Sequence, residues 1–516
     1  MSPTIEELKQ KTARQEQQIA ELSAKLKWYE EQFRLAQHRR FGASSEQTHP
    51  DQLTLFNEEE AEANPAAPEP TMETITYKRK KTVGGREAKL ASLPVETIEY
   101  RLSEDEQVCS CCAGKLHEMS TEVWRELKLI PPQVNVVEHI RYVYGCRRCE
   151  QEAISTPIVT SPMPTPVVPG SLVSPSMMAY VMSQKYVDSL PLYRQEQQFL
   201  RLGVELSRQT LANWMIAGPE RWLTPLYDYM HKELLRRDIA HADETTLQVL
   251  KEPGRAAQTK SYLWLYHTGR VVPDIILYDY QTGRGGEYPG KFLKGFTGYL
   301  QTDGYSGYNQ VEGVTQLGCW AHARRKYHEA LQALPAGQRS NTVAAEGLAL
   351  CNALFEVERK WKDATPEQRY EARLAESRPI LDAFSAWLEA QRSRVLPKSL
   401  LGTAITYCTN QWEKLNVFLQ DGRLEIDNNR SERSIKPVVI GRKNFLFSNT
   451  PRGAKASAII YSIVETAKAN GLKPHLYLQH LFERLPQLPN PADPEALSKL
   501  VPWSASLPLV CRVYSK

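Results

Sequence analysis

The stretch FTGYLQTDGYSGYN, residues 296–309, places a carboxylate where a strand gives way to a tight turn. Tyr299 and Leu300 are typical of the end of a strand, and Asp303 follows them just before the glycine-bearing turn at 304–307. An aspartate at such a place either shapes the turn or shares a site with other acids. Which of the two applies depends on the segments that the fold brings beside it.

The flanking segments predict a mixed sheet. Three β-rich runs come first, at residues 239–250, 261–268 and 271–280. A helix is expected at 286–294, then the strand that ends at Asp303, then a strand that runs into a helix at 313–331. Three strands, expected to be antiparallel, followed by helix, strand, helix, strand and helix, give the element order of an RNase H-like fold. In that fold the first and fourth strands are parallel neighbours, so Asp243 of the first would meet Asp303 of the fourth at one end of the sheet.

Adjacent carboxylates predict a divalent cation, because they repel each other unless a cation lies between them. The oxygen-preferring ion for such a site is Mg²⁺, or Mn²⁺ in its place. Two such ions would activate a water or a 3′-hydroxyl and stabilise the leaving oxygen of a phosphodiester. In the opposing interpretation, Asp243 and Asp303 are only turn or cap residues.

A third acid is needed to hold a second ion, and residues 421–447 offer Glu425, Asp427 and Glu432. Glu432 is the preferred one, because cations that suit a phosphate follow it closely. These cations are Lys436, Arg442 and Lys443. Glu425 is the alternative, and Asp427 is expected to cap the helix.

Five of the nine cysteines crowd into one short region of the chain. Cys109 and Cys112 form one CxxC pair, and Cys146 and Cys149 form another, with strand-like sequence between the pairs. Four thiolates in this spacing predict a zinc ribbon, and the closed shell indicates a structural Zn²⁺. Cys111 is a spare, and incidental cysteines remain the alternative.

Two helical patterns predict DNA binding. Residues 190–215 resemble a helix-turn-helix, in which Ser207 would cap a recognition helix that carries Arg208, Gln209 and Asn213. Many helical hairpins share this spacing, so it is only one line of support. The helix after the strand at 313–317 has a second basic face, formed by Arg324, Arg325 and Lys326.

The N-terminal residues 4–37 carry an apolar heptad, weak in its second repeat, which predicts a short zipper that makes a homodimer or higher oligomer. The alternative is an amphipathic helix that packs on its own domain. The chain of 516 residues has a formal net charge of only +4, which excludes a bulk polycation but allows local basic patches. No apolar run approaches bilayer length and the first residues are polar, so we expect a cytoplasmic protein with no membrane partner.

Composition and motifs divide the chain into nine segments. These are a zipper helix at 1–47, a disordered linker at 48–91, a zinc ribbon at 92–154, a Pro-rich connector at 155–175, a helix-turn-helix region at 176–235, the first part of the catalytic core at 236–330, a helical insertion at 331–420, the second part of the core with C-terminal helices at 421–488, and a tail without assignment at 489–516.

Four segments of this chain resemble the catalytic-domain motifs of a known family, the DDE-type transposases of the insertion sequence 66 family. These segments are HADET, LQTDGYSGYN, GCWAHARRKY and EIDNNRSERSIKPVVIGRKNFLF. Further resemblances to the zipper, zinc-binding, helix-turn-helix and C-terminal segments of that family extend the match over residues 1–488. The resemblance implies that Asp243, Asp303 and Glu432 form the DDE triad. It also implies hydrolysis at transposon ends, attack of the freed 3′-hydroxyl on target DNA, and small accessory proteins encoded by the same element.

One position departs from the pattern of compact DDE enzymes, which often carry a basic residue about two helical turns after the glutamate. Val439 occupies that place here, so Lys436, Arg442 or Lys443 would have to serve. Two other functions stay open: an RNase H-fold DNA nuclease without strand transfer, and a DNA-binding regulator without enzymatic activity.

Overall fold

The computed structural model describes residues 132–147, 158–270 and 273–513, with Val95, Thr97, Ser103 and Val123 as isolated positions. The predicted zipper and linker, and Cys109, Cys112 and Cys149 of the predicted ribbon, lie outside the described residues. The chain divides into two compact units, residues 1–42 with 137–513 and residues 43–136 with 514–516.

A narrow two-stranded arm comes first. Strands β1 (Val143–Tyr144) and β2 (Val159–Thr160) pair antiparallel, and Arg141 Nε donates to Ser161 O at 2.8 Å beside them. Cys146 follows β1 and is exposed.

Four helices follow the arm: α5 (Pro175–Tyr186), α6 (Leu192–Arg201), α7 (Arg208–Gly218) and α8 (Thr224–Leu235). The turn between α6 and α7 contains Gly203 at φ +82°, a conformation that glycine adopts readily. Ser207 then caps α7 as predicted, because its Oγ accepts the N–H of Thr210 at 3.1 Å. Trp214 is buried and donates to Ser171 Oγ at 2.9 Å, so it belongs to the core of this helical region.

The central sheet is mixed and has five strands in the order β5-β4-β3-β6-β7. They are β3 (Ile239–Gln248), β4 (Lys260–Thr268), β5 (Ile276–Gln281), β6 (Gly298–Gln301) and β7 (Val314–Leu317). The first three pair antiparallel, whereas β6 runs parallel to both β3 and β7. The predicted side-by-side, parallel arrangement of the first and fourth strands is therefore present.

Two strand ends differ from the prediction. The third strand begins at Ile276 rather than 271, and Pro273 cannot donate a ladder hydrogen bond. The fourth strand ends at Gln301, after which Thr302 N still reaches Leu317 O at 3.1 Å but Asp303 already belongs to the turn. Helix α9 (Glu287–Phe292) lies between these two strands, close to the predicted bounds.

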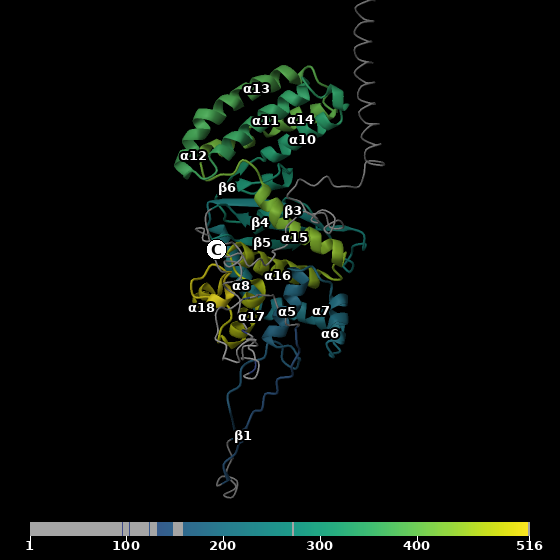
Figure 1. Cartoon of the computed structure of the whole chain (residues 1–516), viewed down its shortest axis with the longest axis vertical. Coiled ribbons are helices and arrows are strands. Elements are labelled where there is room, and N and C mark those ends of the chain that lie inside the picture. Colours follow the sequence, from purple (N-terminus) through teal and green to yellow (C-terminus); the bar gives the residue numbers. More distant parts are fainter. Residues whose placement is uncertain are drawn as a thin grey trace, which may run out of the picture. The chain divides into compact units, whose positions relative to one another are not determined.

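Two long helices after residue 428 cover the sheet. Helix α15 (Asn429–Phe445) packs on β3 and β4, and α16 (Pro451–Ala469) packs along β5 (Figure 1). Strand β5 is an edge strand, and α16 satisfies its outward amides: Ser462 Oγ accepts the N–H of Tyr278 at 2.8 Å, and Thr466 Oγ1 that of Ile276 at 3.0 Å. The edge is thus closed to further strands.

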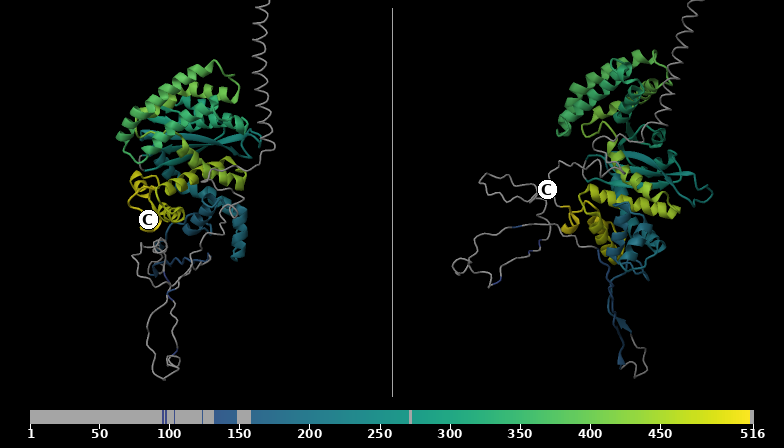
Figure 2. Two further views of the ribbon diagram at one scale, coloured as in Figure 1. Left: turned by 45° about the horizontal axis from the view of Figure 1, so that its top comes forward. Right: turned by 45° about the vertical axis from the view of Figure 1, so that its right-hand side comes forward.

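The residues between β7 and α15 are helical, as predicted. They form α10 (Trp320–Gln332), α11 (Val343–Lys360), α12 (Pro366–Ala372), α13 (Arg378–Arg392) and α14 (Leu400–Asn416). These helices gather beyond the β7 edge of the sheet, on the opposite side from α16 (Figures 1 and 2). Their core includes Trp320, Phe384 and Phe418, and it is continuous with Ile239 and Leu317 of the sheet.

A buried arginine joins the insertion to the segment that leads into α15. Arg373 is only 1% exposed, and its guanidinium pairs with Glu358 and donates to the carbonyl oxygens of Phe418, Asp421 and Leu424. The insertion and the core therefore share a single packed interior.

The end of the described chain, which the sequence left without assignment, is packed. After α17 (Pro474–Arg484) comes α18 (Pro494–Leu500), whose Leu497 and Leu500 are buried. Tyr477 of α17 donates to Leu500 O at 2.6 Å. None of the helices in the described part of the chain has the length and apolarity that a membrane crossing requires.

Candidate active site

Asp243 and Asp303 reach the same level of the sheet. His241 of β3 pairs in register with Gln301 of β6, and each aspartate lies two residues beyond its member of that pair. Because β3 and β6 are parallel neighbours, Asp303, just beyond the end of β6, lies level with Asp243, which is within the longer strand β3. The fold thus brings together two residues that are far apart in the chain.

The side chain of Asp303 takes part in the hydrogen bonding of the turn that follows β6. Asp303 Oδ1 accepts the N–H of Tyr305 at 2.8 Å, and Thr302 Oγ1 accepts that of Gly304 at 3.3 Å. Gly304 has φ +94°, so this turn needs a residue without Cβ strain. Asp303 therefore shapes the turn, as the opposing interpretation of the sequence expected. It also lies near a second acid, Asp243.

Glu432 lies in the first turn of α15 and faces α10. Its carboxylate is 3.4 Å from Arg325 Nη2 and 3.8 Å from His322 Nδ1. The longer distance is not a hydrogen bond, and neither Glu432 Oε1 nor His322 Nδ1 has another partner although both atoms are buried. His322 was not among the residues predicted from the sequence.

Asn428 fixes the start of α15 against two other segments. Its amide Nδ2 donates to Ala242 O at 2.9 Å, and Oδ1 lies 3.1 Å from His241 Nδ1. Its backbone N–H donates to Cys319 Sγ at 3.2 Å, at the start of α10. One buried side chain therefore sets the register between the strand that carries Asp243 and the helix that carries Glu432.

The acids around Asp243 interact strongly. The pKa of Asp243 is raised to about 8, mainly by burial and in addition by the neighbouring carboxylates of Glu244, Asp303 and Glu432. Glu244 is itself held by Tyr308, whose hydroxyl donates at 2.6 Å, and by Arg284 Nε at 2.7 Å. The described residues nevertheless include no preassembled group of three His, Cys, Asp or Glu side chains at metal-binding distances. The acids act on one another through their charges without converging on one point.

The two other acids of the 425–432 segment have structural partners. Glu425 accepts hydrogen bonds from Arg270 and Arg430, both at 3.0 Å, and these cations help to hold its pKa at about 2 despite burial. Asp427 was predicted to cap the helix, but Asn428 occupies the N-cap position of α15. Asp427, one residue earlier, accepts the backbone N–H of Asn429 at 3.1 Å. Of the three acids, Glu432 is the one that interacts with Asp243.

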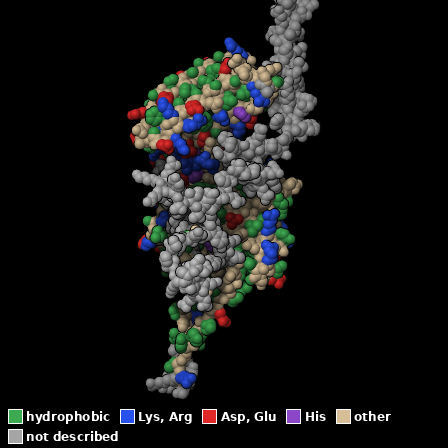
Figure 3. Space-filling model, viewed as in Figure 1, with side chains coloured by type: hydrophobic (Ala, Val, Ile, Leu, Met, Phe, Trp, Pro, Cys, Tyr) green, Lys and Arg blue, Asp and Glu red, His purple; other side chains and the backbone are tan. Residues whose placement is uncertain are grey.

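The predicted cations occupy different surroundings. Arg442 donates to Thr246 Oγ1 at 2.9 Å and so ties α15 to β3. Lys436 and Lys443 are exposed and follow Glu432 at helical spacing on the same face of α15. Arg324 donates to Asn352 Oδ1 at 2.6 Å. Basic side chains gather where the insertion meets the sheet (Figure 3).

Comparison with known families decides the assignment. Residues 170–456, which include every acid described above, match the family model described as Transposase IS66 family. The chain belongs to this family. Three further models match along the transposase: the zinc-finger binding domain of transposase IS66 at 106–150, Transposase C of IS166 homeodomain at 28–98, and the IS66 C-terminal element at 462–503.

Relatives of this transposase occur in Sinorhizobium fredii. The uncharacterized protein y4qI is 33% identical over 426 residues, which cover 79% of this chain and 75% of the relative. The uncharacterized protein y4jD is 29% identical over 446 residues, or 82% of this chain and 84% of the relative. Both matches span most of each protein.

The helix-turn-helix of the transposase exposes the side chains predicted to contact DNA. Arg208, Gln209 and Asn213 lie on the exposed face of α7, and Gln209 Nε2 donates to Asn213 Oδ1 at 3.0 Å. The zinc-finger match spans the four predicted thiolates, of which Cys146 alone is among the described residues.

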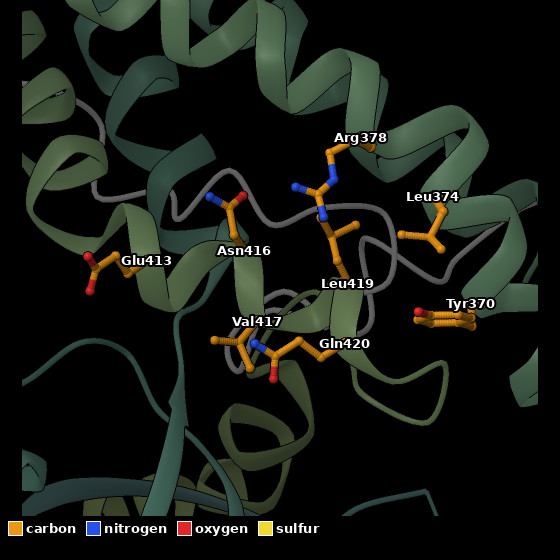
Figure 4. Close-up of a pocket in the computed structure, with 8 residues that line it drawn as sticks. All are labelled: Tyr370, Leu374, Arg378, Glu413, Asn416, Val417, Leu419 and Gln420. Atoms are coloured by element: carbon orange, nitrogen blue, oxygen red, sulfur yellow. The ribbon is translucent and has the colours of Figure 1, made fainter.

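The transposase also has a cavity of about 310 Å³ on the insertion. Tyr370 and Leu374 form one side, and Arg378 and Asn416 reach in from α13 and α14 (Figure 4). A second cavity of about 230 Å³ contains Arg270 and Glu425, which already pair with each other.

Proposed function

We propose that this member of the IS66 transposase family cleaves DNA at the ends of its element and joins the freed 3′-hydroxyl to target DNA, using an RNase H-like core. The observation that carries the proposal is the common level of Asp243 and Asp303 on neighbouring parallel strands, with Glu432 on the helix that packs over them. The order and direction of the five strands support the fold assignment.

In this proposal Asp243, Asp303 and Glu432 hold two Mg²⁺ or Mn²⁺ ions. Their surroundings fit such ions, because Asp243 is a buried carboxylate whose pKa is raised by burial and by three neighbouring acids. Like charges gathered in this way are offset by a cation, and an all-oxygen donor set suits Mg²⁺ and Mn²⁺. When bound, the two ions activate the attacking oxygen and stabilise the leaving one.

The other residues of the site position the DNA. In-line displacement at phosphorus requires alignment and neutralised charge more than covalent chemistry from the protein. Arg325 lies beside Glu432, and Lys436 follows Glu432 by one helical turn, so both can contact a phosphate next to the scissile bond. Lys443, Arg324 and Lys326 extend the same basic surface. Arg442 instead braces α15 against β3.

The remaining segments recognise and pair the DNA ends. The thiolates of Cys109, Cys112, Cys146 and Cys149 hold one structural Zn²⁺, and α7 contacts the terminal inverted repeats. The zipper joins chains into a homodimer or higher oligomer, and accessory proteins of the same element assist. The proposed site of action is the bacterial cytoplasm, at the nucleoid.

The test uses the unmutated protein, Asp303→Ala and linear DNA that carries the inverted repeats flanking the gene. We expect Mg²⁺-dependent cleavage by the unmutated protein, loss of cleavage in Asp303→Ala, and equal DNA affinity of the two. A precleaved 3′-hydroxyl end should become joined to a target plasmid. Cleavage without joining would support a nuclease of the same fold, and DNA binding without cleavage would support a regulator.

A further inference from the structure

The last helix of the insertion lies directly on the turn that carries Asp303. Tyr407 of α14 donates its hydroxyl hydrogen to the backbone oxygen of Asp303 at 3.0 Å. A Cβ atom added at Gly304 would lie 3.3 Å from Gln411 Cδ and 3.5 Å from Tyr407 Oη. The absence of a side chain at Gly304 thus allows α14 to approach the turn closely.

The same helix also holds the far end of this turn. Lys414 Nζ donates to Asn309 Oδ1 at 2.7 Å and to Gln316 Oε1 at 2.6 Å. Its backbone oxygen accepts the N–H of Gly318 at 3.0 Å, just before α10. Tyr407 therefore contacts the start of the turn at Asp303, and Lys414 contacts the chain farther along, at Asn309 and Gln316.

From these contacts we propose that α14 makes the helical insertion a positioning element of the active site, in which Tyr407 and Lys414 hold Asp303 in place beside Asp243. The inference rests on the proposed function and adds a role for residues in the insertion. Tyr407 is a positioning residue, because its hydrogen bond to Asp303 is to the backbone oxygen.

The turn requires such support because strand β6 has only four residues. Asp303 lies two residues beyond the last pair of β6, so the sheet ladder does not restrain the acid. Tyr308, whose hydroxyl bonds Glu244, anchors the turn on the sheet side, and α14 anchors it on the insertion side.

Tyr407 also contacts the basic surface. Lys326 Nζ of α10 lies 5.2 Å from the centre of the Tyr407 ring. One side chain therefore joins the insertion, the Asp303 turn and a cation predicted to contact DNA. A shift of α14 against α10 would move the turn as well.

The experiment compares the full-length unmutated chain with Tyr407→Phe and Lys414→Met, and uses Tyr370→Phe as the matched control. Tyr370 lies on α12 of the same insertion and is 40% exposed. Three quantities are measured: the single-turnover rate of end cleavage at saturating DNA, the dissociation constant of Mn²⁺ by electron paramagnetic resonance, and the midpoint of thermal unfolding.

We expect Tyr407→Phe and Lys414→Met each to slow cleavage about fivefold to tenfold, the effect of about one hydrogen bond, and to weaken Mn²⁺ binding. DNA affinity and the thermal midpoint should stay close to those of Tyr370→Phe. Cleavage and Mn²⁺ binding unchanged by both α14 substitutions would overturn the inference, and so would losses matched by an equal fall in thermal midpoint.

A failure of the proposed function gives a different result. If the unmutated chain binds Mn²⁺ but does not cleave, the proposed function fails, and the Mn²⁺ affinities of the variants still decide whether α14 positions Asp303. If the unmutated chain binds no Mn²⁺, both proposals are overturned.

Discussion

Asn428 is not one of the acids of the site, but its buried amide side chain sets the position of the segments that carry them. Its side chain is 1% exposed and bonds to Ala242 and His241, next to Asp243. Asn428→Asp keeps the size but replaces the donor that serves Ala242 O by an acceptor. We expect the free energy of unfolding to fall by roughly 1–3 kcal/mol and cleavage to slow. Urea unfolding and single-turnover cleavage check this.

Asn429→Asp is the matched control for that substitution, because the Asn429 amide donates only to Asp427 within its own segment, at 2.8 Å. Its effect on cleavage should be smaller. Equal cleavage rates for Asn428→Asp and the unmutated chain would contradict the role assigned to Asn428.

Glu425 and Glu432 separate structural from chemical roles within one short segment. The pKa of Glu425 is lowered to about 2 from an ordinary value of 4.5, so its contribution to stability is present above pH 4.5 and is lost as the pH falls towards 2. That contribution is about 3 kcal/mol by the linkage relation. Glu425→Gln should therefore lower stability at pH 7 and flatten the loss of stability between pH 4.5 and 2. Chemical denaturation across this pH range measures both effects.

Glu432→Gln provides the comparison with Glu425→Gln. It should abolish cleavage and leave stability at pH 7 nearly unchanged, because its nearest cation, Arg325, is half exposed. If Glu425→Gln, with its fold intact, abolished cleavage and Glu432→Gln did not, the third acid would have to be reassigned to Glu425.

At the scale of elements, the sheet was predictable because each strand carries its own signal. The runs around Asp243 and Asp303 have strand composition, and their order fixes which strands become neighbours. Strand ends were less predictable: Asp303 lies beyond the last pair of β6, a boundary set by the turn and by hydrogen bonding to β7. Patterns in a single sequence therefore show where a strand or helix lies more reliably than they show at which residue it begins or ends.

The contacts that assemble the site were not predictable, because each joins segments remote in sequence. The Tyr407 bond to Asp303 and the Asn428 bond to Ala242 cross more than a hundred residues. Glu244 was not predicted as a site residue, although its place next to Asp243 in the sequence could have indicated it. The tail also escaped prediction, since α18 is a short helix with only a few buried leucines.

The ribbon gives a prediction at the element scale. The four thiolates should bind one Zn²⁺ per chain, and Cys112→Ser should lose it because three ligands hold the ion more weakly. Cys111→Ser is the matched control, since Cys111 is a neighbouring thiol outside both CxxC pairs. Zinc content by atomic emission after dialysis distinguishes them. Equal loss in the two variants, or no zinc in the unmutated chain, would rule out this ligand set.

At the scale of the whole molecule, the insertion and the core act as one body. Arg373 and Glu358 bond within a shared interior, and α14 reaches the Asp303 turn. The insertion lies in sequence between the second aspartate and Glu432, and it packs against the segments that carry both acids. This connectivity gives a physical reason for contacts between α14 and the turn.

The predicted zipper gives the last prediction, because a dimer would provide one chain for each of two DNA ends. The heptad places Ile19 on the seam and Gln17 on the outward face of the helix. Ile19→Glu puts a charge into an apolar interface and should dissociate the oligomer in sedimentation velocity, whereas Gln17→Glu, the control, adds the same charge away from the seam. With Ile19→Glu, joint cleavage of two ends should fall and binding of a single end should persist. If the helix instead packs on its own domain, Ile19→Glu would lower the thermal midpoint and leave the sedimentation coefficient unchanged, and the zipper would be rejected.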